Sequence, residues 1–283
     1  MVHILDGKAL SQKIRKEISI ELKERRSSPH LVVFLSYPDP ASLVYVKHKL
    51  RACEEVGIRT TILDQEHNST DTLLQELEKW NKDPDVDGIL VQFPLHQKVD
   101  QTTIMQHISP QKDVDGVHPD NLGKLVMGDP SGFVPCTPLG IYTLLTSYTI
   151  PLSGKHVVIV GRSVTVGKPL ALLLSQKGVD ATVTLAHSKT EHLEKLCQSA
   201  DILIAAAGKE NLITAEMVHE KSVVIDVGIN RKDVNGVSRL IGDVDFENVS
   251  PICSAISPVP GGVGPMTIAS LLSNTVKSFE RRS

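Results

Sequence analysis

Short apolar runs of strand length alternate with amphipathic segments along the whole chain of 283 residues. In the first half, the apolar runs cover residues 31–35, 60–63 and 88–92, and amphipathic segments cover residues 9–25 and 72–80. Buried strands that alternate with helices are typical of a parallel β-sheet covered by helices. The first half is therefore expected to form one α/β domain.

A second series of apolar runs follows a region rich in proline and glycine at residues 110–138. These runs, again separated by helical segments, lie at residues 156–160, 182–186, 201–206 and 223–227. The pattern predicts fold class α/β with two α/β domains, the second of them Rossmann-like. Residues 1–139 plus 265–283 are expected to form the first domain, and residues 140–264 the second.

Composition and charge argue against several classes of function. No apolar run approaches the about 20 residues that cross a bilayer, and the N-terminus has no basic segment followed by an apolar one. A net charge of −3 and an aromatic content of 4% speak against a nucleic-acid or membrane partner. The four cysteines are far apart, so neither a disulfide framework nor a metal site is indicated. We therefore expect a cytoplasmic protein.

The second domain begins with a segment that reads as a strand, a glycine turn and the start of a helix, residues 155–170. Such an arrangement presents backbone amides and a helix dipole to a pyrophosphate group. Gly161 and Gly167 do not follow the regular G-x-G-x-x-G spacing, so the turn alone is weak support, and a plain βαβ crossover is the alternative. The next strand ends in Ser188 and Lys189, without the acidic residue that receives an NAD ribose hydroxyl.

Arg162 in the glycine turn and Ser188 together supply a cation and a hydroxyl able to meet a 2′-phosphate. This pair favours NADP over NAD as the cofactor. The two following strands end near Ala207 and Gly208 and in the Gly-Ile-Asn of residues 228–230, where small residues let a nicotinamide ring lie close to the backbone. Either glycine could equally serve a simple turn.

Residues 40–56 are expected to form one helix, because Asp39 and Pro40 are a good N-cap and first-turn pair and Gly57 follows the segment. On this helix Ser42, Tyr45 and Lys49 are spaced by three and four residues and share one face. A hydroxyl, a phenol and an ammonium in one stack can relay a proton, and a desolvated lysine can act as a base near neutral pH. The alternative is an exposed polar stripe without function.

Gln92 ends a predicted strand and offers an amide able to hold Lys49. Asp113 and Asp115 lie in a loop, and either carboxylate could accept paired N–H donors from a heterocycle or cap the turn at Gly116. Capping fits Asp113 better, which leaves Asp115 as the binding candidate. The Tyr-x-x-x-Lys spacing also matches short-chain dehydrogenases, but in those enzymes the pair follows the dinucleotide-binding glycines instead of preceding them.

The segment 258–267 has three prolines and three glycines in its first eight positions, directly before an apolar helical run. Because proline fixes φ near −65° and glycine reaches positive φ, this composition specifies a stiff backbone path. Gly264 as the N-cap and Pro265 as the first helical residue would aim free amides at whatever lies in front of the helix. The alternative is a tight domain connection without a ligand.

Eight segments carry a further signal when they are taken together and in order. They are the Ser-x-x-Tyr-x-x-x-Lys of residues 42–49, Val-Gln-Phe-Pro-Leu of 91–95, Lys-Asp-Val-Asp-Gly of 112–116, Pro-Cys-Thr-Pro of 135–138, Gly-Arg-Ser-x-x-Val-Gly-x-Pro of 161–169, Val-Ile-Asp-Val-Gly-Ile-Asn of 224–230, Gly-Asp-Val of 242–244 and Pro-Val-Pro-Gly-Gly-Val-Gly-Pro-Met-Thr of 258–267. These segments closely resemble the bifunctional methylenetetrahydrofolate dehydrogenase/methenyltetrahydrofolate cyclohydrolase family. The resemblance covers nearly the whole chain.

The resemblance implies NADP-dependent oxidation of 5,10-methylenetetrahydrofolate to 5,10-methenyltetrahydrofolate, followed by hydrolysis to 10-formyltetrahydrofolate. It also implies a homodimer, a cleft between the two α/β domains, and tetrahydrofolate one-carbon derivatives as substrates. In this scheme Lys49 is the acid/base of the hydrolysis and Gln92 tunes it. Tyr45 stacks on the folate, and Asp115 grips the pterin. The further substrate contacts it implies are Ser42, Pro258, Gly261 and Gly262, and the cofactor contacts are Gly161, Arg162, Ser163, Val166, Gly167, Ser188, Ala207, Gly208, Ile229 and Thr267.

Three positions depart from the family pattern. Ser36 stands where the family usually has glycine, Phe93 where it has leucine and His96 where it has proline. All three lie beside the expected folate site, so they put the folate affinity and the balance of the two activities in question. Two other functions stay open: a monofunctional NAD-dependent methylenetetrahydrofolate dehydrogenase, and a nucleotide-binding regulatory module without turnover. The regulatory module would better suit a chain that lacks Lys49 and Gln92.

Overall fold

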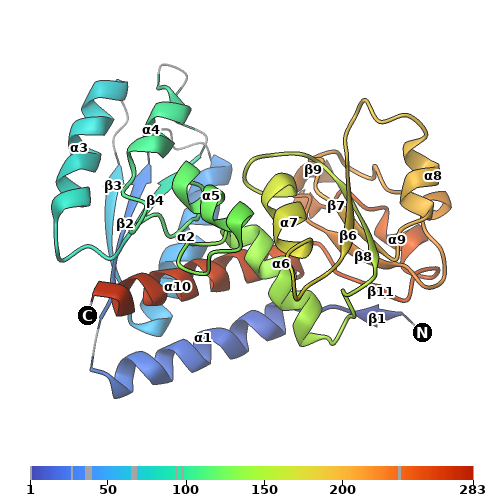
Figure 1. The fold of residues 1–283 in the computed structure, drawn as a ribbon, viewed down its shortest axis with the longest axis horizontal. Helices are drawn as coiled ribbons and strands as arrows, with labels where there is room; N and C mark the ends of the chain where they lie inside the picture. The colour runs from blue at the N-terminus through green and yellow to red at the C-terminus, as the bar shows by residue number, and fades with distance from the viewer. Residues whose placement is uncertain are drawn as a thin grey trace. The chain divides into compact units, whose positions relative to one another are not determined.

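The chain forms two compact units in the computed structural model (Figure 1). Unit 1 contains Met1–Ser11 and Thr137–Thr267, and unit 2 contains Gln12–Cys136 and Ile268–Ser283. The expected domain boundaries after residues 139 and 264 stay a prediction. The structure describes residues 2–26, 28–35, 40–64, 69–93, 95–96, 99–234 and 237–282.

Unit 2 is built on a three-stranded parallel sheet in the order β3-β2-β4. The strands are β2 (His30–Leu35), β3 (Arg59–Asp64) and β4 (Gly88–Gln92). Every residue of β2 is buried, as expected for the central strand of a sheet that helices cover on both faces. The three predicted strands are therefore confirmed, each to within one residue at either end.

Alternate residues of β2 face two different layers of helices. Val33 belongs to a core that α1, α2 and α10 share, whereas Phe34 belongs to a second core with α3 and α4. Because side chains alternate across a strand, this pattern places one helical layer on each face of the sheet (Figure 1). The helices are α1 (Gly7–Glu24), α2 (Pro40–Val56), α3 (Thr70–Lys82), α4 (Gln101–His107) and α10 (Val263–Arg282). The range predicted for α2 is confirmed.

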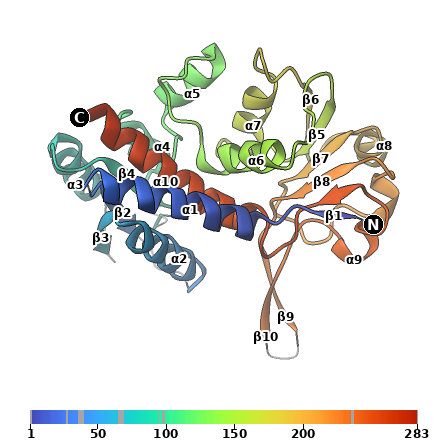
Figure 2. The same ribbon diagram turned by 90° about the horizontal axis from the view of Figure 1, so that it is seen from below.

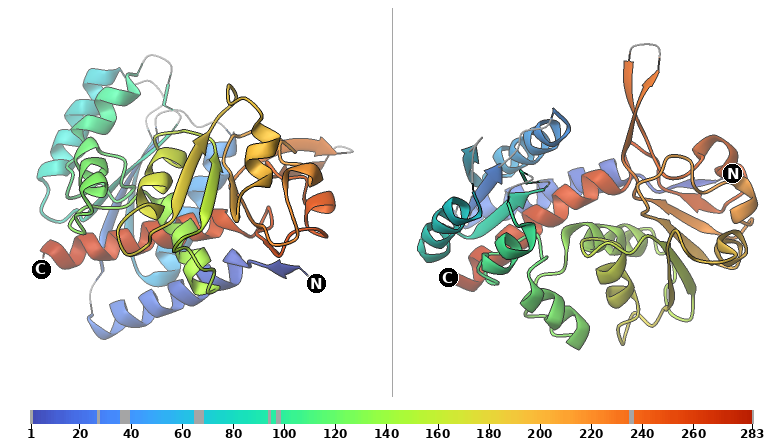
Figure 3. Two further views of the ribbon diagram at one scale, coloured as in Figure 1. Left: turned by 45° about the vertical axis from the view of Figure 1, so that its right-hand side comes forward. Right: turned by 90° about the horizontal axis from the view of Figure 1, so that it is seen from above.

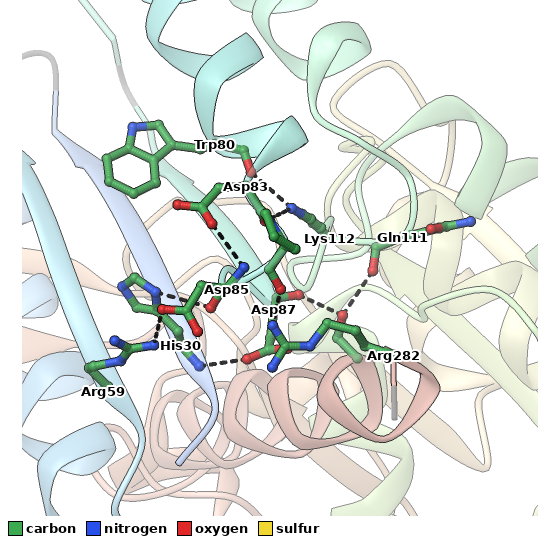
Figure 4. Close-up of polar contacts among 11 residues, drawn as sticks. His30, Arg59, Trp80, Asp83, Asp85, Asp87, Gln111, Lys112 and Arg282 are labelled. Carbon is green, nitrogen blue, oxygen red and sulfur yellow. Dashed lines mark hydrogen bonds and ion pairs between the residues drawn. The ribbon is translucent and has the colours of Figure 1, made fainter. Parts of the chain in front are cut away.

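A clasp of polar side chains ties the amino ends of the strands in unit 2 (Figure 4). The backbone N–H of His30 donates to Asp87 Oδ2 at 2.8 Å, and the His30 ring places Nε2 2.8 Å from Thr61 Oγ1. Nδ1 of the same ring lies 3.2 Å from the carbonyl oxygen of Asp85, whose carboxylate pairs with Arg59. Burial lowers the pKa of His30, which favours the neutral ring. The clasp lies at the edge of the sheet opposite to Gln92.

Unit 1 is built on a six-stranded parallel sheet in the order β1-β11-β8-β7-β5-β6. The strands are β1 (His3–Ile4), β5 (His156–Val160), β6 (Thr182–Ala186), β7 (Ile202–Ala205), β8 (Val223–Asp226) and β11 (Ala255–Ile256). The predicted strands β5 to β8 are confirmed to within one residue at either end. The chain crosses from β6 over β5 to β7, and a doubly wound sheet binds ligands at the carboxyl ends of strands beside such a reversal.

A hairpin of β9 (Asn230–Val234) and β10 (Val237–Ile241) extends away from the six-stranded sheet of unit 1, as Figures 2 and 3 show. The remaining helices are α5 (Pro119–Met127), α6 (Cys136–Ser147), α7 (Gly167–Leu174), α8 (Leu193–Gln198) and α9 (Phe246–Val249), with a short 3₁₀ helix at Ala215–Met217. Among the described residues, no helix has the length and apolar character needed to cross a membrane.

The helix α10 begins at Val263, earlier than the sequence predicts. Pro265 is therefore the third helical residue instead of the first. The first turn of a helix tolerates proline because its N–H groups have no partner within the helix. The expected N-cap role of Gly264 is wrong for this reason, since this residue already lies inside the first turn.

Candidate functional site

Helix α2 places Lys49 against the carboxyl end of β4 in unit 2. Val46 and Cys53 of the same helix are buried in the core, and Lys49 itself is only 9% exposed. Its Nζ donates a hydrogen bond to Gln92 Oε1 at 2.9 Å. The Gln92 amide nitrogen donates to the carbonyl oxygen of Phe93 at 2.8 Å, which fixes the carboxamide with its oxygen toward the ammonium. The structure thus contains the Lys49–Gln92 contact that the sequence suggested.

Tyr45 lies one turn before Lys49 on α2 and is partly buried. Burial raises the pKa of its phenol, so the side chain stays neutral at physiological pH. The spacing of four residues puts Tyr45 and Lys49 on the same face of the helix. The side chain of Ser42, the third member of the predicted face, lies outside the described residues, as does Ser36.

Two buried thiols that the sequence did not connect with the site lie close to Lys49. Burial raises the pKa of the Cys53 thiol to about 12, and it raises that of Cys136 well above its usual value. The positive charge of Lys49 acts on both thiols in the opposite direction, whereas the negative charge of Asp115 adds to the rise at Cys136. The surroundings of Lys49 therefore include the neutral thiols of Cys53 and Cys136.

Asp113 and Asp115 have different surroundings. Asp113 is fully buried, and its carboxylate accepts hydrogen bonds from the N–H groups of Gly116 and His118 at 3.1 and 2.8 Å and from Asn121 Nδ2 at 2.8 Å. It caps the turn, as expected. Asp115 is only partly buried, so its carboxylate is the one that stays accessible to a ligand.

Asn274 of α10 holds the loops that carry Asp115 and Cys136. Its side-chain nitrogen donates to the carbonyl oxygens of Val114 and Val134, at 2.9 and 3.1 Å. Asn274 is separated from both loops by more than a hundred residues of sequence, and no local pattern marks it. Sequence reasoning missed this residue, and only the fold reveals it.

The glycine turn of unit 1 follows β5 directly. A Cβ atom on Gly161, whose φ is +136°, would overlap the carbonyl oxygen of Ala206, and one on Gly167 would overlap the carbonyl oxygen of Gly161. Both positions therefore require glycine. Ser163 Oγ accepts the N–H of Val166 at 3.1 Å just before α7 begins. A pyrophosphate fits such a turn, because its backbone is bare and it leads into a helix N-terminus.

The other predicted cofactor residues of unit 1 follow neighbouring strands of the same sheet. Ser188 lies in the turn after β6, Ala207 and Gly208 follow β7, and Ile229 lies in the segment after β8. All four are exposed. Because these strands are parallel, the residues lie along the carboxyl edge of the sheet together with the glycine turn.

The proline- and glycine-rich segment also belongs to unit 1. The N–H of Gly262 donates to the carbonyl oxygen of Pro258 at 2.8 Å, and the N–H of Lys8 donates to that of Gly261 at 2.8 Å. These contacts fix the loop against the start of α1. Thr267 Oγ1 lies 3.1 Å from Thr137 Oγ1 in the same unit.

The chain thus falls in the class of α/β enzymes that carry a dinucleotide-binding unit and a separate catalytic unit. Two sequence models support a more specific assignment. The catalytic domain of tetrahydrofolate dehydrogenase/cyclohydrolase matches residues 5–115, and the NAD(P)-binding domain of the same enzymes matches residues 135–283. The chain belongs to the tetrahydrofolate dehydrogenase/cyclohydrolase family.

Individual relatives agree with this assignment over nearly their full lengths. The bifunctional protein FolD of Chlorobium limicola is 50% identical, with 98% of each chain covered. The crystal structure of the bifunctional dehydrogenase/cyclohydrolase FolD from Campylobacter jejuni is 47% identical, with a TM-score of 0.95 and 100% of each chain covered. A Trypanosoma brucei dehydrogenase-cyclohydrolase, solved in complex with NADP and an inhibitor, is 34% identical, with a TM-score of 0.93 and 99% of this chain and 98% of that one covered.

Proposed function

We propose that this chain oxidises 5,10-methylenetetrahydrofolate to 5,10-methenyltetrahydrofolate with NADP and then hydrolyses the product to 10-formyltetrahydrofolate. The buried contact between Lys49 and Gln92 carries the proposal, because a monofunctional dehydrogenase has no need of a positioned amine. The full-length likeness to bifunctional relatives favours two activities over the monofunctional NAD-dependent alternative. The enzyme serves one-carbon metabolism.

The oxidation depends on positioning. The lone pair of a substrate nitrogen drives the loss of hydride from the methylene carbon, so no protein acid or base is needed. NADP supplies the hydride acceptor when it is bound. Gly161 and Gly167 would hold its pyrophosphate, Arg162 and Ser188 would hold its 2′-phosphate, and Ala207 would contact its nicotinamide half. Ser163, Val166, Gly208, Ile229 and Thr267 complete this contact set.

The hydrolysis depends on proton transfer. Water adds to the electron-poor methenyl carbon and must lose a proton, and the ring nitrogen must gain one when its bond to that carbon breaks. Lys49 moves these protons, and Gln92 holds its Nζ in place. Tyr45 stacks on the folate, Asp115 binds pterin N–H groups, and the remaining substrate contacts are Ser42, Pro258, Gly261 and Gly262.

A direct assay tests the two activities together. Mixing the protein with 5,10-methylenetetrahydrofolate and NADP should produce the absorbance of the methenyl product, which then decays faster than it does without protein. If the methenyl product accumulates and the protein does not accelerate its decay, the result would point to the monofunctional dehydrogenase. Cofactor binding with no methenyl product, with either NADP or NAD, would point to a regulatory module.

We expect Arg162→Ala to reduce the preference for NADP over NAD. A charge-assisted hydrogen bond to the 2′-phosphate contributes about 1.5–3 kcal/mol, so the ratio of kcat/KM for NADP to that for NAD should fall by about 10- to 150-fold. Lys168→Ala is the matched control, because Lys168 is an exposed cation in the first turn of α7. An unchanged ratio in Arg162→Ala would remove this residue from the phosphate site.

The quaternary state and the compartment are further parts of the proposal: a cytoplasmic homodimer. Leu240 lies in the hairpin of unit 1, and its apolar side chain is 39% exposed in the single chain. Contact with a second copy would cover it. Sedimentation equilibrium should therefore give twice the chain mass of 30.8 kDa. A mass of one chain at micromolar concentration would contradict the homodimer.

A further inference from the structure

Two buried carboxylates lie beneath the loops that follow β7 and β8 in unit 1. Asp226 is 2% exposed and Asp243 is fully buried. The hydrogen bonds that the structure records for their carboxylates come from backbone N–H groups and one side-chain amide. Buried charges are costly unless hydrogen bonds satisfy them, so two in adjacent loops call for a functional reason.

Asp243 fixes the loop that follows β7. Its Oδ2 accepts the N–H groups of Ala207 and Gly208, at 2.7 and 2.8 Å. Both residues are nevertheless exposed, so their N–H groups point inward while their outer face stays open. This loop can therefore offer a ligand its carbonyl oxygens and apolar surface, but not these two N–H donors.

The same carboxylate fixes the segment that follows β8. Its Oδ1 accepts Asn230 Nδ2 at 3.0 Å, and a Cβ atom on Gly228 would overlap this oxygen. Gly228 and Asn230 flank Ile229, which is 44% exposed. A single side chain thus holds the backbone around three of the predicted cofactor contacts.

Asp226 holds Asp243 in turn. Its Oδ1 accepts the N–H of Asp243 at 2.9 Å and that of Gly228 at 3.0 Å, and its Oδ2 accepts the N–H of Val244 at 3.0 Å. A Cβ atom on Gly242 would overlap Asp226 Oδ2. The two glycines and the two aspartates therefore form one interlocked set, in which neither carboxylate has room for a larger neighbour.

We propose that Asp243 is a positioning residue for the nicotinamide half of NADP, because it shapes the loops after β7 and β8 without touching the cofactor. The inference rests on the proposed function and adds a division of labour to it. The glycine turn offers N–H donors, which suit the pyrophosphate. In the loops after β7 and β8, the two aspartates accept the N–H groups of Ala207, Gly208 and Gly228, which leaves carbonyl oxygens that suit the N–H donors of the nicotinamide carboxamide.

Binding measurements with a whole cofactor and with a fragment test this division. The probes are NADP and 2′,5′-ADP, which carries the adenosine and the 2′-phosphate but no nicotinamide, and calorimetry gives both Kd values. Asp243→Asn keeps one acceptor oxygen and replaces the other with an NH₂ group, which must then face either the N–H groups of Ala207 and Gly208 or the side-chain amide of Asn230. The Kd for NADP should rise by about tenfold or more, while that for 2′,5′-ADP stays within about twofold of the wild-type value.

Asp201→Asn is the matched control. Asp201 precedes the same strand β7 at its amino end, and it accepts the N–H of His156 at 2.9 Å and Lys155 Nζ at 3.3 Å. The substitution makes the same chemical change at another carboxylate that accepts a backbone N–H, but it lies at the sheet edge opposite to the cofactor loops. It should leave both Kd values unchanged, even if it lowers the melting temperature.

Several outcomes would overturn the inference. If Asp243→Asn raises the Kd for NADP and that for 2′,5′-ADP equally, Asp243 has a general role in stability. If neither Kd rises, Asp243 has no role in cofactor binding. If Asp243→Asn does not fold, the two Kd values are compared for Asn230→Ala, which removes a single hydrogen bond to the Asp243 carboxylate. A selective rise in the Kd for NADP is again the expected result. A wild-type protein that binds neither probe would refute the proposed function and this inference together, whereas binding without the selective loss would refute the inference alone.

Discussion

Replacing Lys49 with methionine should stop the hydrolysis of 5,10-methenyltetrahydrofolate while the oxidation of 5,10-methylenetetrahydrofolate continues. Methionine keeps the length and apolar stem of the side chain but cannot carry a proton. General acid–base catalysis contributes about 10²- to 10⁴-fold, so the hydrolysis rate should fall by at least about 100-fold. The oxidation needs no protein base, and its rate should change far less. Both rates follow from the methenyl absorbance, by its decay for the hydrolysis and by its growth with NADP for the oxidation.

Lys47→Met is the matched control for this experiment. Lys47 lies two residues earlier on α2 and is exposed, so the same substitution there removes a charge without touching the site. Lys49→Met also leaves Gln92 Oε1 without its ammonium partner, which costs about 1–3 kcal/mol of folding free energy. The retained oxidation shows that the variant is folded. If hydrolysis survives in Lys49→Met, Lys49 is not the acid/base. If both activities vanish in a folded protein, Lys49 binds the substrate instead.

The strands and helices that depend on neighbouring residues could be predicted from the sequence. The apolar run at 88–92 and the helix at 40–56 coincide with β4 and α2, because neighbouring residues determine the burial of a strand and the capping of a helix. Gln92 at the end of β4 and Lys49 on α2 then follow from the rule that functional groups gather at the carboxyl ends of parallel strands. The contact between them adds what no pattern gives, namely which carboxamide atom faces the amine.

Other parts depend on contacts between distant residues and leave no local signal. The strands β1 and β11 have two residues each, which is too short for any periodicity, and they exist because β1 pairs with β11 and β11 pairs with β8. Asp243 stands in the Gly-Asp-Val that contributes to the family resemblance, but this segment gives the aspartate no role, and only the fold shows five groups gathered around Asp226 and Asp243. Such residues become visible when the backbone they hold is known.

The same arrangement of a histidine, an aspartate and a threonine occurs inside each unit, and the sequence does not reveal it. His156 begins strand β5 of unit 1, its N–H donates to Asp201 Oδ2 at 2.9 Å, and its Nε2 lies 2.9 Å from Thr184 Oγ1. His30, Asp87 and Thr61 make the same three-residue clasp in unit 2, with the threonine at the same register on the neighbouring strand. The sequence shows no repeat, because the histidine and the aspartate are 57 residues apart in one unit and 45 in the other. Both units thus fix the amino ends of their strands in one way and leave the carboxyl ends for chemistry.

A substitution in the glycine turn of unit 1 should affect the two activities in the opposite way to Lys49→Met. Gly161→Ala should strongly weaken the NADP-dependent oxidation and spare the hydrolysis, which needs no cofactor. The new Cβ would overlap the carbonyl oxygen of Ala206, and the φ of +136° is one that alanine rarely adopts. Strain of about 3 kcal/mol would move the turn out of its binding geometry and correspond to a loss of affinity of about 100-fold. Calorimetry with NADP and the two absorbance assays measure these effects.

Gly178→Ala separates the overlap from the backbone strain. Gly178 lies in the same unit and has a φ of +93°, but a Cβ there meets nothing within 4 Å. This control should lose some stability and keep both the affinity for NADP and the oxidation. If Gly161→Ala and Gly178→Ala behave alike, the close approach to Ala206 is not what shapes the turn. If Gly161→Ala loses the hydrolysis as well, the lysine site of unit 2 depends on the glycine turn of unit 1. The opposite losses expected in Lys49→Met and Gly161→Ala would then not be seen, and the two reactions could not be assigned to groups on separate units.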